Sequence, residues 1–244
     1  MGTVLFSAPP RFKKIGDGSI FRGSKNRTVP NFRRTAIVVF CSGEGTNLQA
    51  ILDATRGGRL RARVALVVSD RPNAKALRRA ARAGAEARYV NPHDYPTRGA
   101  YERALIRLCE ARSVRLICLA GFMRILSPVF VRRYRHRILN IHPALLPAFP
   151  GAHAVRDALA WRAKVTGVTV HLVDEAVDHG PILLQEALTI KPRETEASLL
   201  TRVHRVEHRL YPKAIGLMLA GRARVRGRAA VIASLGRRTR RSPR

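Results

Sequence analysis

The sequence of 244 residues contains few cysteines, a single tryptophan and few acidic side chains. Its three cysteines, Cys41, Cys109 and Cys118, are too few and too irregularly spaced for a disulfide framework or a CxxC metal site. This cysteine usage indicates reduced thiols and a cytoplasmic protein. The chain has no run of about 18 apolar residues, which argues against a membrane span. Its hydrophobic content of 46% nevertheless suffices for one substantial core.

Because acidic residues are scarce, the chain carries a formal net charge of +30, from 46 Lys and Arg against 16 Asp and Glu. Residues 1–34 hold eight Lys or Arg and one Asp, and residues 221–244 hold nine Arg and no acid. Both segments have the Gly, Ser, Pro and Arg content of disordered, solvated tails. The remaining body is still basic, and a positive field of this kind favours anionic small molecules.

This distribution predicts a basic N-terminal extension over residues 1–34, one folded domain over residues 35–221 and an Arg-rich tail over residues 222–244. Nucleic acid is then expected to bind only nonspecifically, through the basic tails. The N-terminal segment also has the basic, acid-poor composition of an organelle transit peptide, so organelle targeting stays open beside a cytoplasmic location.

Short apolar runs alternate with helical patterns along the central part of the chain. Residues 36–40 form a β-branched and aromatic run typical of a strand buried on both faces. The alternation predicts an α/β fold, a doubly wound and mostly parallel Rossmann-like sheet with helices on both faces. We expect further strands at residues 63–69, 87–90, 115–119 and 137–141, and an antiparallel pair of strands at residues 167–173 and 182–189. Helices are expected at residues 73–83 and 98–111, from residue 127, and at residues 194–220. Pro212 is expected to kink or divide the last of these helices.

A glycine-containing loop follows the first predicted strand and precedes a helix. Gly43 and Gly45 let the backbone turn tightly, which directs free amides and the positive end of the helix at an anion. Thr46 and Asn47 add side-chain donors. The loop matches neither GxGxxG nor a P-loop, so it favours a phosphate site without specifying a nucleotide, and an ordinary tight turn is the alternative.

Asn140 and His142 stand at the end of a predicted strand, and Asp178 follows later in an Asp-His-Gly-Pro segment. Residues spaced i and i+2 in a strand share a face, so the amide and the imidazole converge. With a carboxylate they suit acyl transfer, because two donors stabilise the developing oxyanion and the carboxylate helps to remove a proton from an amine. Taken singly, each residue has a structural alternative, such as a turn aspartate or a hydrogen-bonded histidine.

Several motifs occur in a fixed order along the same region. They are residues 42–47, 120–128 and 139–147, then His171, residues 178–181, and the pairs Glu207-His208 and Tyr211-Pro212. With these motifs, residues 36–221 resemble the folate-dependent phosphoribosylglycinamide formyltransferases of purine synthesis. The resemblance implies transfer of a formyl group from 10-formyltetrahydrofolate, as co-substrate, to the amine of glycinamide ribonucleotide during synthesis of IMP. It also implies no metal, no membrane, small-molecule partners, and a monomer or a homodimer.

The resemblance further implies roles for individual residues. The implied catalytic residues are Asn140, His142 and Asp178. The implied ribonucleotide ligands are Gly45, Thr46, Asn47 and Glu207. The implied folate-binding residues are Arg98, Met123, Arg124, Ile125, Leu126, Asn140 and His171, with residues 173–177 in the wall of the pterin pocket.

Two positions depart from the pattern of the resembled family: Glu44 stands in the phosphate loop, and Val155 stands where a second histidine is usual. Methionyl-tRNA formyltransferase, which shares such a trio, and formyltetrahydrofolate hydrolase are rival enzymes, yet each would call for an additional domain. A rival of another class is a nucleic-acid-binding protein that uses the basic tails, with the α/β domain as a platform.

Overall fold

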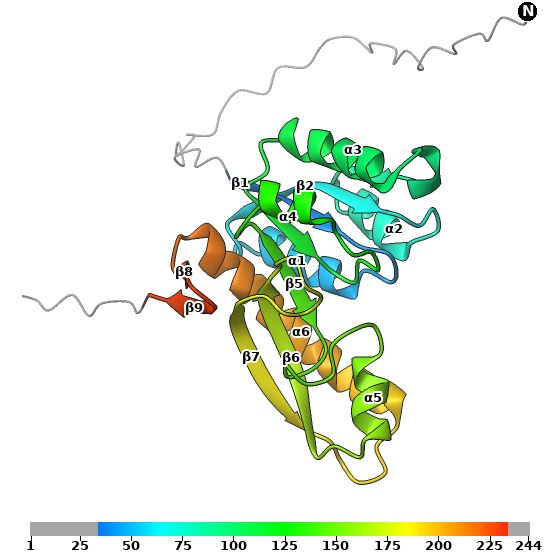
Figure 1. The fold of residues 1–244 in the computed structure, drawn as a ribbon, viewed down its shortest axis with the longest axis vertical. Coiled ribbons are helices and arrows are strands. Elements are labelled where there is room, and N and C mark those ends of the chain that lie inside the picture. Colours follow the sequence, from blue (N-terminus) through cyan, green and yellow to red (C-terminus); the bar gives the residue numbers. More distant parts are fainter. Residues whose placement is uncertain (1–33, 234–244) are drawn as a thin grey trace, which may run out of the picture. The chain divides into compact units, whose positions relative to one another are not determined.

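The computed structural model, which describes residues 34–233, contains one seven-stranded sheet (Figure 1). Its strands are β1 (Thr35–Phe40), β2 (Ala62–Ser69), β3 (Ala87–Tyr89), β4 (Leu116–Leu119), β5 (Ile138–His142), β6 (Val165–Leu172) and β7 (Ile182–Thr189). They lie in the order β3-β2-β1-β4-β5-β6-β7, parallel from β3 to β5 and antiparallel for the last two. The predicted mostly parallel, doubly wound sheet is confirmed.

Helices cover both faces of this sheet, as the alternating pattern predicts. They are α1 (Thr46–Arg56), α2 (Lys75–Arg82), α3 (Arg98–Glu110), α4 (Pro128–Arg133), α5 (Ala154–Ala160) and α6 (Glu196–Leu219), with a short 3-10 helix η1 (Pro92–Asp94). Helices α1, α2, α5 and α6 pack on one face, and α3 and α4 pack on the other (Figure 1). Within residues 34–233, none of the helices combines the length and the apolar composition that a bilayer span requires.

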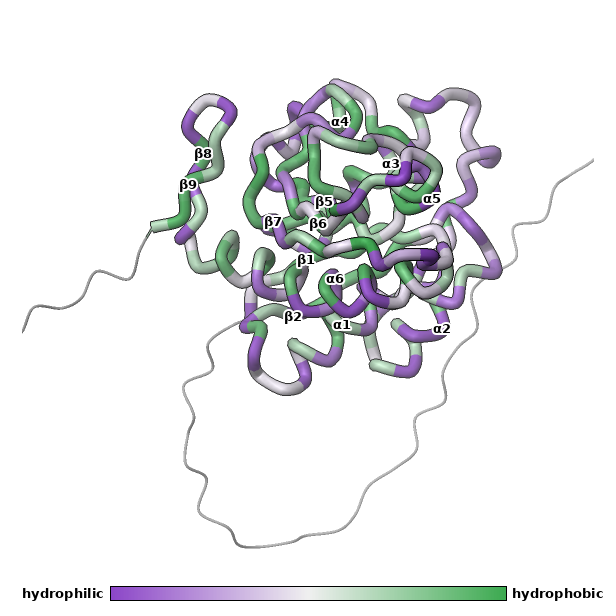
Figure 2. Tube along the Cα trace, turned by 90° about the horizontal axis from the view of Figure 1, so that it is seen from below, coloured by the Kyte–Doolittle hydropathy of each residue, from purple (hydrophilic) through white to green (hydrophobic). Residues whose placement is uncertain are grey.

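Strand β1 illustrates how the sheet is buried on both faces. Its side chains alternate, so Ile37 and Val39 lie in the core shared with α1 and α6, while Val38 and Phe40 lie in the core shared with α3 and α4. All four side chains are fully buried. In Figure 2, hydrophobic residues are concentrated along the central strands and hydrophilic residues on the outward turns. The continuous apolar run at residues 36–40 is therefore a strand that helices cover on both faces of the sheet.

The long helix α6 is anchored to two central strands, β4 and β5. It begins after Thr195, whose hydroxyl accepts a hydrogen bond from an amide of the first turn. The hydroxyl of the buried Tyr211 lies 2.8 Å from both the Leu119 and the Leu139 carbonyl oxygen. Of the two predicted effects of Pro212, a kink or a division of the helix, the division does not occur, because α6 is continuous through this residue. Burial of Tyr211 against the sheet holds the helix together although a proline inside it removes one backbone hydrogen bond.

Three features differ from the sequence-based predictions. Helix α5 adds a short element between β5 and β6. The connection between β6 and β7 runs from residue 173 to residue 181, which is longer than a tight Asp-His-Gly-Pro turn. Residues 223–232, expected in the Arg-rich tail, form a hairpin of β8 (Ala223–Arg226) and β9 (Ala229–Ile232).

The hairpin forms because apolar and basic residues alternate beside a glycine turn. Ala223 and Val225 pack against the core, whereas Arg224 and Arg226 face solvent. Gly227 turns the chain with a φ of 58°. The predictions for residues 1–33 and for the tail beyond residue 233 lie outside the described residues.

Candidate active site

The loops that follow β1, β4 and β5 meet at one edge of the sheet, where the strand order reverses between β1 and β4. Such switch points are the usual ligand sites of open α/β sheets. The Ser42 amide donates to the Gly121 carbonyl oxygen at 2.9 Å, and the Ser42 hydroxyl accepts from the Met123 amide at 2.9 Å. The loops after β1 and β4 are thus tied directly to each other.

Gly45 forms the turn from β1 into α1. Its φ of 72° is left-handed, and an added Cβ would lie 2.7 Å from the Cα atom of Ala76, so a side chain has no room there. At Gly43 an added Cβ would meet no atom within 4 Å, so the tight turn depends on Gly45. The first amides of α1, at Thr46 and Asn47, have no partner inside the helix and therefore suit an anion.

Asn47 joins the start of α1 to α6 through a buried carboxyl group. Its Nδ2 atom donates to Oε2 of Glu207 at 2.9 Å, although the two residues are 160 positions apart. Glu207 is only 5% exposed, and burial raises its pKa to about 7, against a smaller lowering by the Asn47 hydrogen bond. Within residues 34–233, the enclosed Oδ1 atom of Asn47 has no hydrogen-bond partner. The pair offers a free acceptor beside a carboxyl group that titrates near neutral pH.

Asp178 holds Asn140 and His142 together at the end of β5. The Nδ2 atom of Asn140 donates to Oδ1 of Asp178 at 3.3 Å, and Nδ1 of His142 lies 3.3 Å from Oδ2 of the same carboxylate. As the i, i+2 spacing predicts, both strand residues reach one face. Asp178 has a φ of 50°, an uncommon value that aspartate tolerates, and its Oδ2 atom accepts the Gly151 amide at 2.8 Å.

The surroundings of this cluster set its ionisation. Burial lowers the pKa of His142, and the Asp178 carboxylate and the Phe149 carbonyl raise it by less. Burial works to raise the pKa of Asp178, but the His171 imidazole, the Gly151 amide and the charge of His142 together lower it by more. At neutral pH the cluster therefore combines an ionised Asp178 with a neutral His142.

Two backbone groups complete the cluster, and no side-chain pattern predicts either of them. The Phe149 carbonyl oxygen lies 2.7 Å from Nε2 of His142, so acceptors face both ring nitrogens. The Gly151 amide holds the Asp178 carboxylate, as described above. The one local signal in the sequence is the glycine itself, since its φ of 95° disfavours any other residue.

His171 adds a second imidazole to the cluster. It pairs with Asn140 across the antiparallel β5 and β6 ladder and is buried. Its Nε2 atom lies 3.1 Å from Nδ2 of Asn140 and 3.5 Å from Oδ1 of Asp178. Its Nδ1 atom lies 3.0 Å from the Leu172 carbonyl oxygen. This position lets His171 orient both Asn140 and Asp178.

The loop after β4 carries four of the residues expected to bind folate, Met123, Arg124, Ile125 and Leu126, and it contacts a fifth, Arg98. Arg98, at the start of α3, donates from Nη2 to the Ile125 carbonyl oxygen at 2.6 Å and from Nε to Glu102 at 3.1 Å. Met123 and Ile125 are 64% and 65% exposed, whereas the Leu126 side chain is buried in the core. Arg98 therefore supports the loop backbone while two apolar side chains remain available to a ligand.

Arg124, in the same loop, is held by the end of β2 and by α3. Its guanidinium carbon lies 5.5 Å from the centroid of the Tyr101 ring, and its Nη1 atom lies 4.0 Å from Oδ2 of Asp70. Asp70 also accepts a hydrogen bond from the Ser42 hydroxyl at 2.6 Å. The strand ends of β1, β2 and β4 thus form one connected edge.

The two departures from the resembled family have simple structural consequences. Glu44 is exposed and pairs with Lys75 at 2.9 Å, which balances its charge beside the glycine turn. Val155, in α5, is buried in the core and makes no part of the cluster. Neither position disturbs the contacts of Asn140, His142 or Asp178.

The three cysteines are unsuited to nucleophilic chemistry. Cys41, Cys109 and Cys118 are free and buried. Burial raises the pKa of both Cys41 and Cys109 to about 12, which keeps these thiols protonated. In the part of the chain that the structure describes, no group of three or more His, Cys, Asp or Glu side chains is arranged to hold a metal ion.

Comparison with known proteins identifies the family of this chain. The family model described as formyl transferase matches residues 35–215, a range that contains the glycine turn and all three clustered residues. The chain belongs to the formyl transferase family. The end of α6 and the β8 and β9 hairpin lie beyond the matched residues.

This formyl transferase is 45% identical over 193 residues to the trifunctional purine biosynthetic protein adenosine-3 of Drosophila melanogaster, covering 78% of this chain but only 14% of that protein. It is 40% identical over 181 residues to phosphoribosylglycinamide formyltransferase of Bacillus subtilis (strain 168), covering 74% of this chain and 93% of the relative. The solved structure of glycinamide ribonucleotide transformylase 1 from Symbiobacterium toebii is 48% identical with a TM-score of 0.81, covering 82% of this chain and 94% of that one. The chain thus spans a small part of the trifunctional relative and nearly the whole of the other two.

Proposed function

We propose that this formyl transferase moves the formyl group of 10-formyltetrahydrofolate to the primary amine of glycinamide ribonucleotide. The products are formylglycinamide ribonucleotide and tetrahydrofolate, and the reaction belongs to de novo purine synthesis. The observation that carries the proposal is the cluster of Asn140, His142 and Asp178 at the same sheet edge as the Gly45 turn. Two similar proteins, matched over nearly their whole length, are named for this activity.

Asn140 is the proposed donor to the formyl oxygen. As the amine attacks the formyl carbon, negative charge develops on that oxygen, and a preorganised donor stabilises it. The Nδ2 atom of Asn140 makes only long contacts, 3.1 Å to His171 and 3.3 Å to Asp178, so one of its hydrogens is readily redirected to the oxyanion. Loss of one such donor costs about 10²- to 10³-fold in turnover.

Asp178 is the proposed acceptor of the proton that the amine loses. Its lowered pKa keeps it ionised at neutral pH, and a carboxylate takes up a proton directly or through one water molecule. His142 becomes the imidazolium when Asp178 passes the amine proton on to Nδ1 of His142, which lies 3.3 Å from the carboxylate oxygen, and the positive ring then stabilises the oxyanion. The amine adds to the formyl carbon and gives a tetrahedral adduct with the negative charge on oxygen. When the adduct collapses, the bond between the formyl carbon and N10 of the folate breaks, and His142 gives the proton that came from the amine to N10.

The two substrates are proposed to occupy neighbouring parts of the sheet edge. The acceptor phosphate binds the amides of Gly45, Thr46 and Asn47, and Glu207 accepts a ribose hydroxyl. The proposed folate site is formed by Arg98, Met123, Arg124, Ile125, Leu126, Asn140 and His171, with residues 173–177. The partners are therefore small molecules, and the free, buried cysteines fit a cytoplasmic location.

A comparison of acceptors tests the proposal. The full chain is supplied with 10-formyltetrahydrofolate and either glycinamide ribonucleotide, methionyl-tRNA or water alone, and release of tetrahydrofolate is followed by absorbance. We expect turnover that depends on glycinamide ribonucleotide, and turnover that is at least about 100-fold slower with methionyl-tRNA or with water alone. Rapid release with water alone would identify a hydrolase, and transfer to tRNA would identify a tRNA formyltransferase. Either result would overturn the proposal.

A further inference from the structure

Asp70 follows directly after the end of β2 and is buried, with only 6% of the residue exposed. It is not among the residues to which the proposed function gives a role. A buried carboxylate costs free energy unless other groups pair with it, so its partners show which parts of the molecule it holds. Its two oxygen atoms face two different loops of the sheet edge.

One oxygen atom of Asp70 acts through Ser42. The Ser42 hydroxyl donates to Oδ1 of Asp70 at 2.6 Å and accepts from the Met123 amide at 2.9 Å. A hydroxyl has a single hydrogen, so donation to Asp70 leaves the lone pairs of its oxygen to face the amide. Asp70 therefore fixes the direction of the Ser42 hydroxyl and, through it, the place of the Met123 amide.

The other oxygen atom of Asp70 faces Arg124. Oδ2 of Asp70 lies 4.0 Å from Nη1 of Arg124, and the guanidinium carbon lies 5.5 Å from the centroid of the Tyr101 ring. The Arg124 side chain is still 40% exposed, so part of the guanidinium remains available to a ligand. An arginine that is held before a ligand arrives loses less conformational freedom when the ligand binds.

Both contacts of Asp70 thus lead to neighbouring residues of the loop after β4, Met123 and Arg124, which the proposed function assigns to folate. The glycine-containing loop after β1 has a separate attachment, because the Ser42 amide donates to the Gly121 carbonyl oxygen at 2.9 Å. The backbone of that loop therefore keeps its place without the Ser42 hydroxyl. Loss of the Asp70 contacts should disturb the folate site and leave the ribonucleotide site intact.

We propose that Asp70 is a positioning residue for the folate substrate, which sets the Met123 amide through Ser42 and the Arg124 guanidinium directly. The inference rests on the proposed function, since it assigns Asp70 to folate binding by the loop after β4. The reacting groups at Asn140, His142 and Asp178 are unchanged by it. A contact that supports binding of the substrate and of the transition state equally raises KM without changing kcat.

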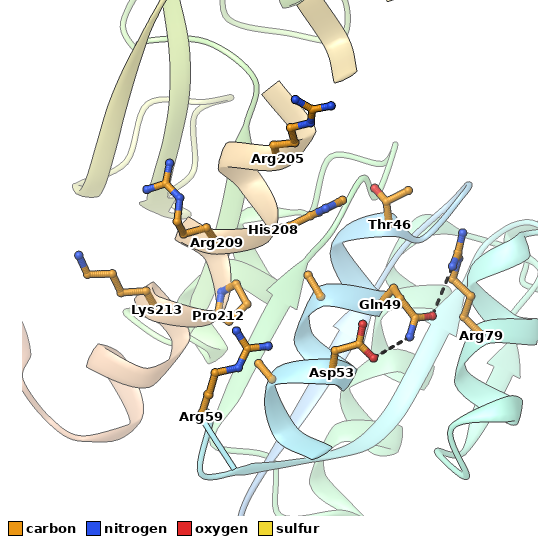
Figure 3. Close-up of a pocket in the computed structure, with 12 residues that line it drawn as sticks. Thr46, Gln49, Asp53, Arg59, Arg79, Arg205, His208, Arg209, Pro212 and Lys213 are labelled. Carbon is orange, nitrogen blue, oxygen red and sulfur yellow. Dashed lines mark hydrogen bonds between the residues drawn. The ribbon is translucent and has the colours of Figure 1, made fainter. Parts of the chain in front are cut away.

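Titration calorimetry of the full chain with 5-formyltetrahydrofolate tests the proposal, because this folate has no formyl group on N10 to transfer. Asp70→Asn keeps an oxygen acceptor for the Ser42 hydroxyl and removes the charge beside Arg124, whereas Ser42→Ala removes the other contact. The matched control is Asp53→Asn, since Asp53 is an exposed residue of α1 whose carboxylate also accepts a side-chain hydrogen bond, from Gln49 at 3.0 Å (Figure 3). We expect folate binding to weaken about five- to twentyfold in Asp70→Asn and in Ser42→Ala, and less than about twofold in the control.

Steady-state kinetics of the same variants separates positioning from a general loss of structure. The folate KM should rise by the same factor as the dissociation constant, while kcat and the ribonucleotide KM stay within about twofold of the unmodified protein. A ribonucleotide KM that rises as much as the folate KM would show a general structural defect and would overturn the proposal.

Folate binding by Asp70→Asn that equals or exceeds that of the unmodified protein would also overturn it, because Asp70 would then merely compete with folate for Arg124. If the unmodified chain binds no folate, the proposed function fails together with this inference. If the unmodified chain binds folate and Asp70→Asn binds it equally well, only the role of Asp70 fails.

Discussion

Replacing Glu207 by glutamine removes a buried ionisable group while keeping its shape and the hydrogen bond from Asn47. Burial raises the pKa of this carboxyl group from its ordinary value of 4.5 to about 7. The folded protein therefore binds this proton more tightly than the unfolded chain does. The stability that results is present in full below pH 4.5 and is lost as the pH rises through about 7.

The difference between these two pKa values is worth about 3 kcal/mol of unfolding free energy. Glutamine does not titrate, so Glu207→Gln escapes this loss. We expect the variant to gain about 3 kcal/mol relative to the unmodified protein between about pH 4.5 and about pH 8. The ribonucleotide KM should rise at the same time, because the amide is a weaker acceptor for a ribose hydroxyl than a carboxylate is.

Urea unfolding of both proteins across this pH range measures the effect. The difference between the two curves cancels the titration of every other group, and Glu175→Gln, which removes an exposed carboxylate, is the control. A difference between Glu207→Gln and the unmodified protein that stays constant with pH would refute the reasoning from burial.

Three further predictions concern the clustered residues and their surroundings. Asp178→Asn removes the proton acceptor, so turnover should fall about 10²- to 10⁴-fold while folate affinity, measured by fluorescence titration, changes little. Gly45→Ala forces a Cβ against Ala76 at a left-handed φ, so urea unfolding should show a loss of about 1–3 kcal/mol and the ribonucleotide KM should rise. Nη1 of Arg228 lies 2.7 Å from Nε2 of His179, and this contact ties the β8 and β9 hairpin to the loop that carries Asp178. Arg228→Ala removes the contact, so steady-state kinetics should show kcat lowered about two- to fivefold. Unchanged turnover in the first or third variant, or unchanged stability and KM in the second, would contradict the corresponding structural role.

The fold was predictable from the sequence where a short segment alone determines its structure. Residues 36–40 read correctly as a doubly buried strand because an uninterrupted apolar run has no solvent face to offer. Pro212 shows the limit of local reading, since its ring predicts a break whereas the burial of Tyr211 beside it keeps α6 continuous. The hairpin at residues 223–232 was not predicted, because its arginines suggest a solvated tail although Ala223 and Val225 pack on the core.

The candidate site was predictable where its chemistry depends on residue spacing. Asn140 and His142 share a face because a strand repeats every two residues. The carbonyl of Phe149 and the amide of Gly151 were not predictable, since backbone groups are alike in every residue and only the path of the chain brings them to the cluster. The raised pKa of Glu207 was equally hidden, because its burial arises only when α6 packs on α1.

The most direct test of formyl transfer at Asn140, His142 and Asp178 is the turnover of 10-formyltetrahydrofolate with glycinamide ribonucleotide by the variant His142→Ala. Folate affinity is measured on the same preparation, so that a folding defect is recognised. We predict turnover lower by about 10³-fold or more, with folate affinity within about threefold of the unmodified protein, because the imidazole is needed mainly in the transition state. Turnover equal to that of the unmodified protein would contradict a catalytic role for the cluster.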